Sequence, residues 1–228
     1  MEALNVSLND DATRAAYCVA HDGYRAAWLP RALGAMLVWC GNVVYGERPT
    51  YLKFRAVEVI ARVPYHSWQS AIYTLLTLFY TDESRALKYA QTSEFARHAQ
   101  DNETMHVVVI SQLAHKAERA GMLRHTTIPV MFAFLYFWVS YWLYLIRPRW
   151  SYELNYLFEQ HAYDQYSRFI KDNEVVLKGK SIQSAFLTWY GRHLANEYEF
   201  FCSVRNDEII HRNRSVEAAL RYTQRTPS

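Results

Sequence analysis

The sequence reads AQDNETMH at residues 99–106 and RNDEIIHRN at residues 205–213. Each stretch places a glutamate three residues before a histidine. On an α-helix, two such positions lie on the same face, about 5–6 Å apart at Cβ, so both side chains can reach one metal ion. One pair alone is weak evidence, because this spacing is common on solvated helices. The two pairs are Glu103 with His106 and Glu208 with His211.

Two further glutamates stand on helical stripes that are otherwise apolar. They are Glu58, in LKFRAVEVIARVPYHSW, and Glu159, in SYELNYLFEQHAYDQYSRF. Burying an acid on such a stripe is costly unless the acid is paired or metal-bound. A di-iron carboxylate site in a four-helix bundle takes one Glu from each of two helices and a Glu-x-x-His pair from each of the other two. The sequence contains these donors in four separate stretches.

This set of donors predicts the metal as well as the fold. Carboxylates and imidazoles without a thiolate suit iron or manganese rather than zinc or copper. We therefore expect a four-helix bundle that binds two metal ions through six side chains. The predicted ligands are Glu58, Glu103, His106, Glu159, Glu208 and His211. The alternative is that four unrelated acids lie on buried or half-buried faces.

The composition favours long helices. Only 7 Gly and 6 Pro among 228 residues disfavour a turn-rich all-β fold, and 51% hydrophobic with 21% charged residues exclude a disordered chain. A net charge of +3 is too small to indicate nucleic-acid binding, and three widely spaced cysteines give neither a disulfide framework nor a metal site. We expect an all-α protein without a nucleic-acid partner. It would have an N-terminal arm at 1–27, one di-iron helical domain at 28–218 and a polar tail at 219–228.

A coarse reading along the chain predicts six helices. They are expected near residues 28–45, 50–78, 86–119, 129–146, 149–173 and 182–218. Residues 171–180 (KDNEVVLKGK) are expected to form the main surface connection before the last ligand-bearing helix.

Two apolar segments, 28–45 and 129–146, indicate contact with a membrane. The second (PVMFAFLYFWVSYWLYLI) holds 18 residues without a charge, which is long enough for a transmembrane helix. Its Trp and Tyr content is also typical of a helix that lies at the lipid headgroups. This segment lies between predicted ligands that must come together at one site. If it crossed the bilayer, those ligands would lie on opposite sides, and the stretch 107–127 is too charged to cross lipid and bring them back together. We therefore expect both segments to lie in one leaflet; a buried core helix is the alternative.

The first 15 residues (MEALNVSLNDDATRA) hold three acids and one arginine. This pattern differs from a secretory signal, which begins with positive charge and continues with an apolar core, and from a transit peptide, which is poor in acids. We expect a monotopic, membrane-associated protein. Its membrane would be a bacterial inner membrane or, if the sequence begins after processing, a mitochondrial or plastid membrane.

Four short motifs occur in a fixed order along the chain. They are E-x-[VI]-A-x-V-P at residues 58–64, N-E-x-M-H at 102–106, the run SYWLYLIRPRWSYELNYLFEQHAYDQYSR at 140–168, and D-E-x-x-H-R at 207–212. Together they resemble the alternative oxidases, including the plastid terminal oxidase branch, over roughly residues 30–215. The resemblance implies a membrane-bound homodimer with two iron ions on the six ligands named above. It also implies oxidation of a quinol with reduction of O2 to water, without proton pumping.

The resemblance assigns roles to other residues. Tyr166 falls where the family has a redox-active tyrosine, and it lies two helical turns beyond Glu159 on the same face. Core packing is the alternative role for this tyrosine. Residues at positions that support the ligands are Asn102, Asp207 and Trp189. Asp207 is of the type that holds the second ring nitrogen of a ligating histidine.

Positions that resemble the family's quinol pocket are Lys53, Val57, His161 and Gln165. Three depart from the family pattern, because Lys53 stands where arginine is usual, His161 replaces an acid and Gln165 replaces threonine. Lysine does not reproduce the bidentate geometry of arginine. These departures keep a second enzyme open, a di-iron monooxygenase that hydroxylates a quinone precursor or another lipid. A third hypothesis is a non-enzymatic helical scaffold at the membrane that has lost its metal.

Overall fold

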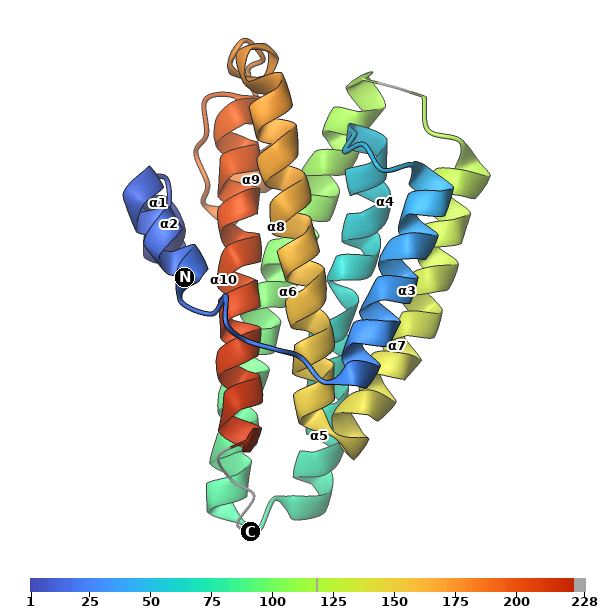
Figure 1. Ribbon diagram of the computed structural model, residues 1–228, viewed down its shortest axis with the longest axis vertical. Coiled ribbons are helices and arrows are strands. Elements are labelled where there is room, and N and C mark those ends of the chain that lie inside the picture. Colours follow the sequence, from blue (N-terminus) through green and yellow to red (C-terminus); the bar gives the residue numbers. More distant parts are fainter. Residues whose placement is uncertain (118, 224–228) are drawn as a thin grey trace. The chain divides into compact units, whose positions relative to one another are not determined.

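Helices dominate the computed structural model, which describes residues 1–117 and 119–223 (Figure 1). Within these residues, the only strand-like pairing is an isolated bridge between Ser181 and Asn196. The predicted all-α class is confirmed. The chain divides into two compact units, which we call the central unit (residues 51–151) and the terminal unit (residues 1–50 with the described part of 152–228). Each unit is described by itself, and the single domain at 28–218 stays a prediction.

The central unit begins with two helices where the sequence predicted one. Its elements are α4, Tyr51–Ala61; α5, Val63–Phe79; α6, Glu83–Ala117; a π-helix, Leu123–Thr127; and α7, Ile128–Ile146. The single helix expected at 50–78 is wrong, because the chain breaks at Arg62 between α4 and α5. Pro64 lies in the first turn of α5, where its missing N–H costs nothing, whereas in a continuous helix its ring would clash with the preceding turn. The helix expected at 86–119 is α6, and residue 118 lies outside the described residues.

Polar side chains join α5 to its neighbours inside the central unit. Trp68 is fully buried, and its indole Nε1 donates a hydrogen bond to Ser151 Oγ at 2.7 Å. Ser67 Oγ donates to Ser140 Oγ of α7 at 2.7 Å, and the ring of Tyr144 lies 6.2 Å from that of Trp68. Nearly every residue of α7 is apolar, so hydrophobicity alone does not select which side of this helix packs against α5. The contacts of Ser140 and Tyr144 select that side.

The terminal unit contains the remaining helices. They are α1, Glu2–Ser7; α2, Asp11–Val19; α3, Trp28–Tyr45; α8, Pro148–Lys178, whose first four residues belong to the central unit; α9, Ala185–Tyr190; and α10, Glu197–Thr223. The predicted arm at 1–27 therefore contains two short helices, which we call the N-terminal hairpin. α10 continues to Thr223, and residues 224–228 of the predicted polar tail lie outside the described residues.

Residues 171–180 are not the surface connection that the sequence predicted, because α8 continues to Lys178. Leu177 is fully buried, and Lys178 Nζ lies 2.6 Å from Glu174 Oε1 one turn earlier. A buried leucine and a pair of opposite charges at i,i+4 both favour continuation of the helix.

The helix expected at 182–218 is also wrong, because the chain forms the short α9 and then α10. Gly191 ends α9 with φ 92°, a left-handed conformation that glycine adopts without steric cost. Ser184 caps the start of α9 by accepting a hydrogen bond from the backbone N–H of Leu187.

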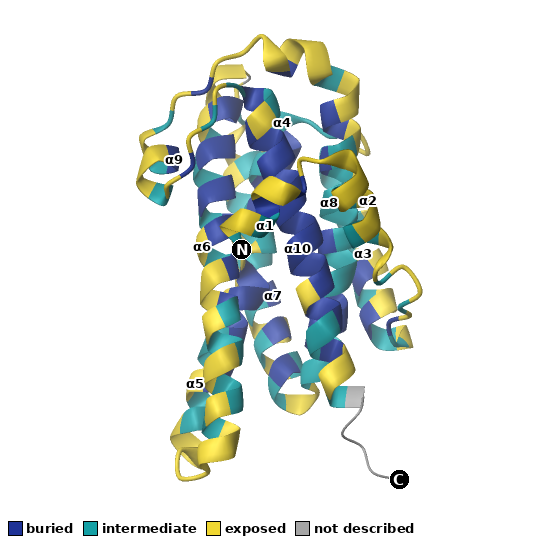
Figure 2. Cartoon of the chain, turned by 90° about the vertical axis from the view of Figure 1, so that its left-hand side faces the viewer, coloured by how far each residue is buried: buried dark blue, intermediate teal, exposed yellow. Residues whose placement is uncertain are grey.

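α8 and α10 run antiparallel within the terminal unit. Tyr152, early in α8, lies with its ring 6.0 Å from that of Tyr222, late in α10. Tyr166, farther along α8, lies 6.2 Å from Phe201, early in α10. Figure 2 shows that buried residues extend along much of α10. This pairing places Glu159 of α8 opposite the middle of α10, where Glu208 and His211 lie.

Each unit also exposes an apolar helix. The segment Leu123–Ile146 is, among the described residues, the one helix long and apolar enough to cross a membrane, and 22% of its apolar window is buried. Its large exposed side chains on α7 are Val130, Met131, Phe134, Leu135, Trp138, Val139, Trp142 and Ile146. α3 exposes Trp28, Met36, Trp39 and Val43. α3 packs against α8 at Gly34, where a Cβ atom would stand 3.3 Å from Leu157 Cδ1.

Candidate metal centre

Three predicted ligands lie together in the central unit. Glu58 comes from α4, and Glu103 and His106 come from α6. His106 Nδ1 lies 3.5 Å from Glu58 Oε2 and 3.5 Å from Glu103 Oε2. One ligand atom from each of the three residues lies within 4.8 Å of the others, and the residues are at most 1% exposed. We call this group the α4–α6 triad.

The terminal unit holds a second group of the same composition. Glu159 comes from α8, and Glu208 and His211 come from α10. His211 Nδ1 lies 3.9 Å from Glu159 Oε2, and one ligand atom from each residue lies within 4.8 Å of the others. All three residues are at most 2% exposed. Asn155 Nδ2 donates to Glu159 Oε1 at 3.1 Å and to Ser215 Oγ at 3.0 Å, which orients this carboxylate. We call this group the α8–α10 triad.

The donor chemistry of both triads fits a hard divalent cation. Each triad offers two carboxylates and one imidazole, and no thiolate is among them. Such oxygen and nitrogen donors suit iron or manganese. Two carboxylates buried side by side repel each other and are desolvated, so a bound cation would favour their charged forms. The residues present therefore fit the predicted iron.

Asp207, which the sequence placed beside the ligands, is held by a buried network. Arg192 Nη1 donates to Asp207 Oδ2 at 2.6 Å, and Arg192 Nη2 donates to Asp207 Oδ1 at 2.9 Å. Asn5 Nδ2 donates to Asp207 Oδ1 at 2.6 Å, and Arg192 also pairs with Glu2 Oε2 at 3.0 Å. Burial by itself would lower the pKa of Arg192, but the charges of Asp207 and Glu2 outweigh it and raise that pKa above its ordinary value.

Sequence reasoning missed Arg192, Asn5 and Glu2. No local pattern singles them out, since Arg192 and Asn5 stand 15 and 202 residues from Asp207 in the chain. Asp207 is the signal that could have indicated such a partner, because an aspartate on a buried helix face needs a cation or hydrogen-bond donors nearby.

The structure places the other predicted residues in different environments. Asn102 and Tyr166 are buried at 3% and 1% exposure, each on a helix that carries ligands. Of the residues predicted for the quinol pocket, Lys53 is buried and Val57 is half-buried on α4, and His161 and Gln165 are half-buried on α8. Trp189 differs, because it lies on α9 with 78% of its surface exposed. The structure does not bring Trp189 to the buried ligands of the terminal unit.

Comparison with known protein families matches residues 28–219 to the family described as alternative oxidase. The chain belongs to the alternative oxidase family. The resemblance stated from the motifs is thereby confirmed, and the N-terminal hairpin lies outside the matched residues. A curated relative is ubiquinol oxidase 4, chloroplastic/chromoplastic, of Arabidopsis thaliana, which is 25% identical over 190 residues. The match covers 75% of this chain and 51% of that protein, so the chain spans about half the length of this relative. No solved structure matches the chain.

Replacing Arg192 by leucine should destabilise this alternative oxidase family member. Asp207 is 3% exposed and would lose its buried counter-charge, so we expect the free energy of unfolding to fall by about 3–5 kcal/mol. Urea-induced unfolding measures this change.

Arg214→Leu is the matched control, because Arg214 lies on α10 with its side chain 46% exposed and pairs with Glu217. We expect that control to change the unfolding free energy by less than about 1 kcal/mol. Equal effects of the two substitutions would contradict the role given to Arg192.

Proposed function

We propose that this protein oxidises a quinol and reduces O2 to water at a di-iron centre that both triads bind. The observation that carries the proposal is the presence, in an alternative oxidase family chain, of two buried triads with the same Glu, Glu and His composition. A di-iron carboxylate centre takes four glutamates and two histidines, which is the sum of the two triads. Neither triad alone has enough donors, so the proposal requires both units to serve one centre in a four-helix bundle of α4, α6, α8 and α10.

Bound iron would supply the redox chemistry, accepting electrons from the quinol and passing them to O2. The four carboxylates would neutralise most of the charge of the metal ions. The two imidazoles are neutral donors, and each follows its glutamate by three residues on one helix, so the backbone fixes the pair. Asn155 holds one carboxylate oxygen of Glu159, and the network of Arg192, Asp207 and Asn5 stabilises the helix turn that contains Glu208.

We assign Tyr166 as the redox-active tyrosine of the centre. It follows Glu159 by two turns on α8, and a long helical side chain leans back toward the N-terminus of its helix. Its 1% exposure excludes water from the ring, which suits a phenol that gives up and regains an electron together with its proton.

We assign the quinol to the region of Lys53, Val57, His161 and Gln165. The name of the Arabidopsis relative, ubiquinol oxidase, supports a quinol as the reductant. A quinol carries an apolar tail and partitions into lipid, so the enzyme needs access to the membrane. The exposed aromatic and aliphatic side chains of α3 and α7 suit burial in one leaflet, in a monotopic arrangement. Following the family resemblance, we further propose a homodimer.

The test of the proposed function is oxygen uptake by iron-loaded protein in liposomes with a short-chain quinol. We expect two quinols to be consumed for each O2, with two quinones and two waters formed. The changed residues of the quinol pocket favour one alternative, a di-iron monooxygenase. That enzyme would instead place one oxygen atom of O2 in a hydroxylated product.

Removing one histidine from either triad should abolish binding of the iron pair. His106→Ala and His211→Ala each take away a neutral donor from one centre, so we expect both variants to lose both iron ions and the oxidase activity. Iron per chain and quinol-dependent oxygen uptake measure the two effects. His98→Ala is the control, since His98 is an exposed residue of α6. A His211→Ala protein that retains a full iron pair would contradict the proposal of a shared centre.

Tyr166→Phe should leave iron bound and slow turnover. The phenol oxygen is lost while the ring keeps its packing against Phe201. We expect oxygen uptake to fall by about tenfold or more, which corresponds to about 1.4 kcal/mol or more in the activation barrier. Tyr156→Phe, on the same helix, is the control and should keep its turnover. Full activity in Tyr166→Phe would contradict the redox role of Tyr166 and leave core packing as its only role.

Leu135→Glu should weaken membrane binding. A charge in the apolar face of α7 opposes burial in lipid, and we expect the partition coefficient into liposomes to fall by about tenfold. Flotation with liposomes measures this change. Leu87→Glu on α6 is a matched control, because Leu87 and Leu135 are both 60% exposed. Equal flotation of the two variants would count against α7 as the membrane-binding surface.

A further inference from the structure

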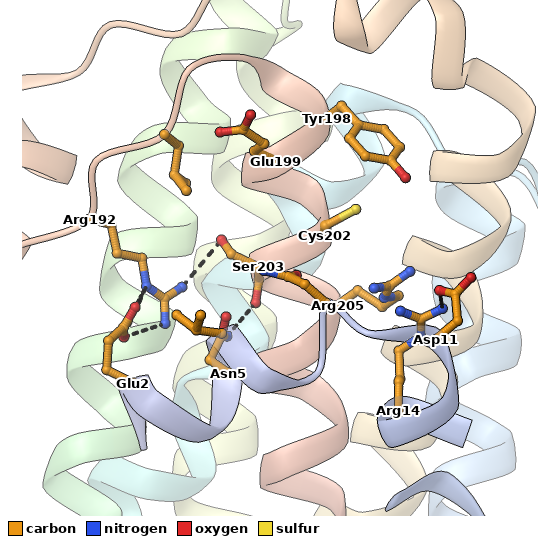
Figure 3. A pocket seen from close by; sticks show the side chains of 13 residues that line it. Glu2, Asn5, Asp11, Arg14, Arg192, Tyr198, Glu199, Cys202, Ser203 and Arg205 are labelled. Carbon is orange, nitrogen blue, oxygen red and sulfur yellow. Dashed lines mark hydrogen bonds and ion pairs between the residues drawn. The ribbon is translucent and has the colours of Figure 1, made fainter. Parts of the chain in front are cut away.

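A pocket of about 380 Å³ lies between the N-terminal hairpin and the first turns of α10 (Figure 3). All of its lining residues belong to the terminal unit. The hairpin side of the pocket lies outside residues 28–219, which are the residues that match the alternative oxidase family. Of the side chains that line it, the proposed oxidase centre uses only Arg192 and Asn5, and these only to support the helix turn that contains Glu208.

In one part of the pocket wall the charged groups already have partners within the protein. Arg192 pairs there with Glu2 and with Asp207, as described above. Glu199 accepts hydrogen bonds from the backbone N–H of Ala195 at 2.8 Å and from Asn196 Nδ2 at 3.2 Å, so its carboxylate caps the start of α10. These groups are already engaged and do not select a ligand.

Another part of the wall contains a buried cation without a counter-charge. Arg205 on α10 is 8% exposed, and its Nε and Nη2 donate to one neutral acceptor, Asn206 Oδ1, at 3.3 and 3.0 Å. Among the described residues, no carboxylate lies within ion-pair distance of Arg205. A guanidinium has five N–H groups, so three of them remain for a ligand. Burial of an uncompensated charge is costly, and burial is the main cause that lowers the pKa of Arg205.

The hairpin supplies a second guanidinium to the same wall. Arg14 on α2 lies close enough to Arg205 that its charge also lowers the pKa of Arg205. Its partner Asp11 has a side chain that is 90% exposed, so solvent screens that ion pair. In Figure 3 the side chains of Arg14 and Arg205 extend toward the same part of the pocket. The whole lining holds three arginines and three acids, and Arg14 and Arg192 are paired with acids, so the local excess of positive charge lies at Arg205.

The hairpin also fixes the orientation of Arg205. Asn206 Nδ2 donates to the backbone oxygen of Asn5 at 3.0 Å and to Asn9 Oδ1 at 2.9 Å. Its Oδ1 is thereby turned toward Arg205. The guanidinium is therefore preorganised, which lowers the entropy that a ligand would have to remove on binding.

We propose that this pocket binds a small oxyanion, a phosphate or carboxylate group, between Arg205 and Arg14. The planar guanidinium matches two oxygens of such a group in bidentate geometry. The pocket is lined further by Tyr198 and Cys202, whose hydroxyl and thiol add neutral donors. A bound oxyanion would join α2 of the hairpin to α10 and neutralise Arg205.

The test is titration of the full-length protein with inorganic phosphate, with acetate and with chloride at equal ionic strength, followed by calorimetry and by thermal unfolding. We expect saturable binding of at least one oxyanion, about tenfold tighter than chloride, with a rise in unfolding temperature. Tighter binding of phosphate assigns the site to phosphate groups, and tighter binding of acetate assigns it to carboxylates. Oxyanion binding no tighter than that of chloride would overturn the proposal.

Two substitutions locate the site. Arg205→Met and Arg14→Gln should each weaken oxyanion binding by about tenfold or more, and Arg214→Met, elsewhere on α10, should leave it unchanged. Arg205→Met removes an uncompensated buried charge and keeps an unbranched side chain, so the fold should be retained. If that variant nevertheless fails to fold, Arg14→Gln decides the question. Unchanged binding in Arg14→Gln would contradict the site, and none of these measurements depends on iron or quinol.

Discussion

The burial of four glutamates is the constraint on which the rest of this structure depends. Glu58, Glu103, Glu159 and Glu208 are at most 2% exposed. A buried carboxylate is stable only when cations, hydrogen-bond donors or a metal compensate its charge. Each glutamate lies with a histidine nitrogen in its own triad, and each triad lies across a pair of helices. The helix pairs α4–α6 and α8–α10 therefore set the positions of the buried glutamates and histidines.

The sequence predicted the two triads because their information is local. The i,i+3 spacing of Glu103 with His106 and of Glu208 with His211 can be recognised within a window of four residues. Single acids on apolar stripes, Glu58 and Glu159, are visible in a helical window. The breaks between helices were harder to predict. Pro64 sits within a continuous apolar pattern, and Gly191 was not distinguished from the helix around it, so both interruptions were missed.

Contacts between residues that are far apart in the chain could not be predicted, because they produce no local sequence pattern. Asp207 was identified beside the ligands, but its partners Arg192 and Asn5 could not be found from spacing alone. Trp189, whose supporting role is transferred by resemblance, lies on the exposed surface of α9, and that role stays a prediction. The orientation of α7 is a further case. The sequence shows only 18 residues without a charge, whereas the structure turns Ser140 and Tyr144 inward and leaves Trp138 and Trp142 on the exposed side.

Anomalous X-ray scattering from crystals of the iron-loaded protein would show whether the proposed single pair of iron ions is bound by both triads. We expect two adjacent iron positions per chain, with Glu58, Glu103 and His106 and also Glu159, Glu208 and His211 within bonding distance of the pair. A single iron per chain, or two separated irons each bound by one triad, would contradict it.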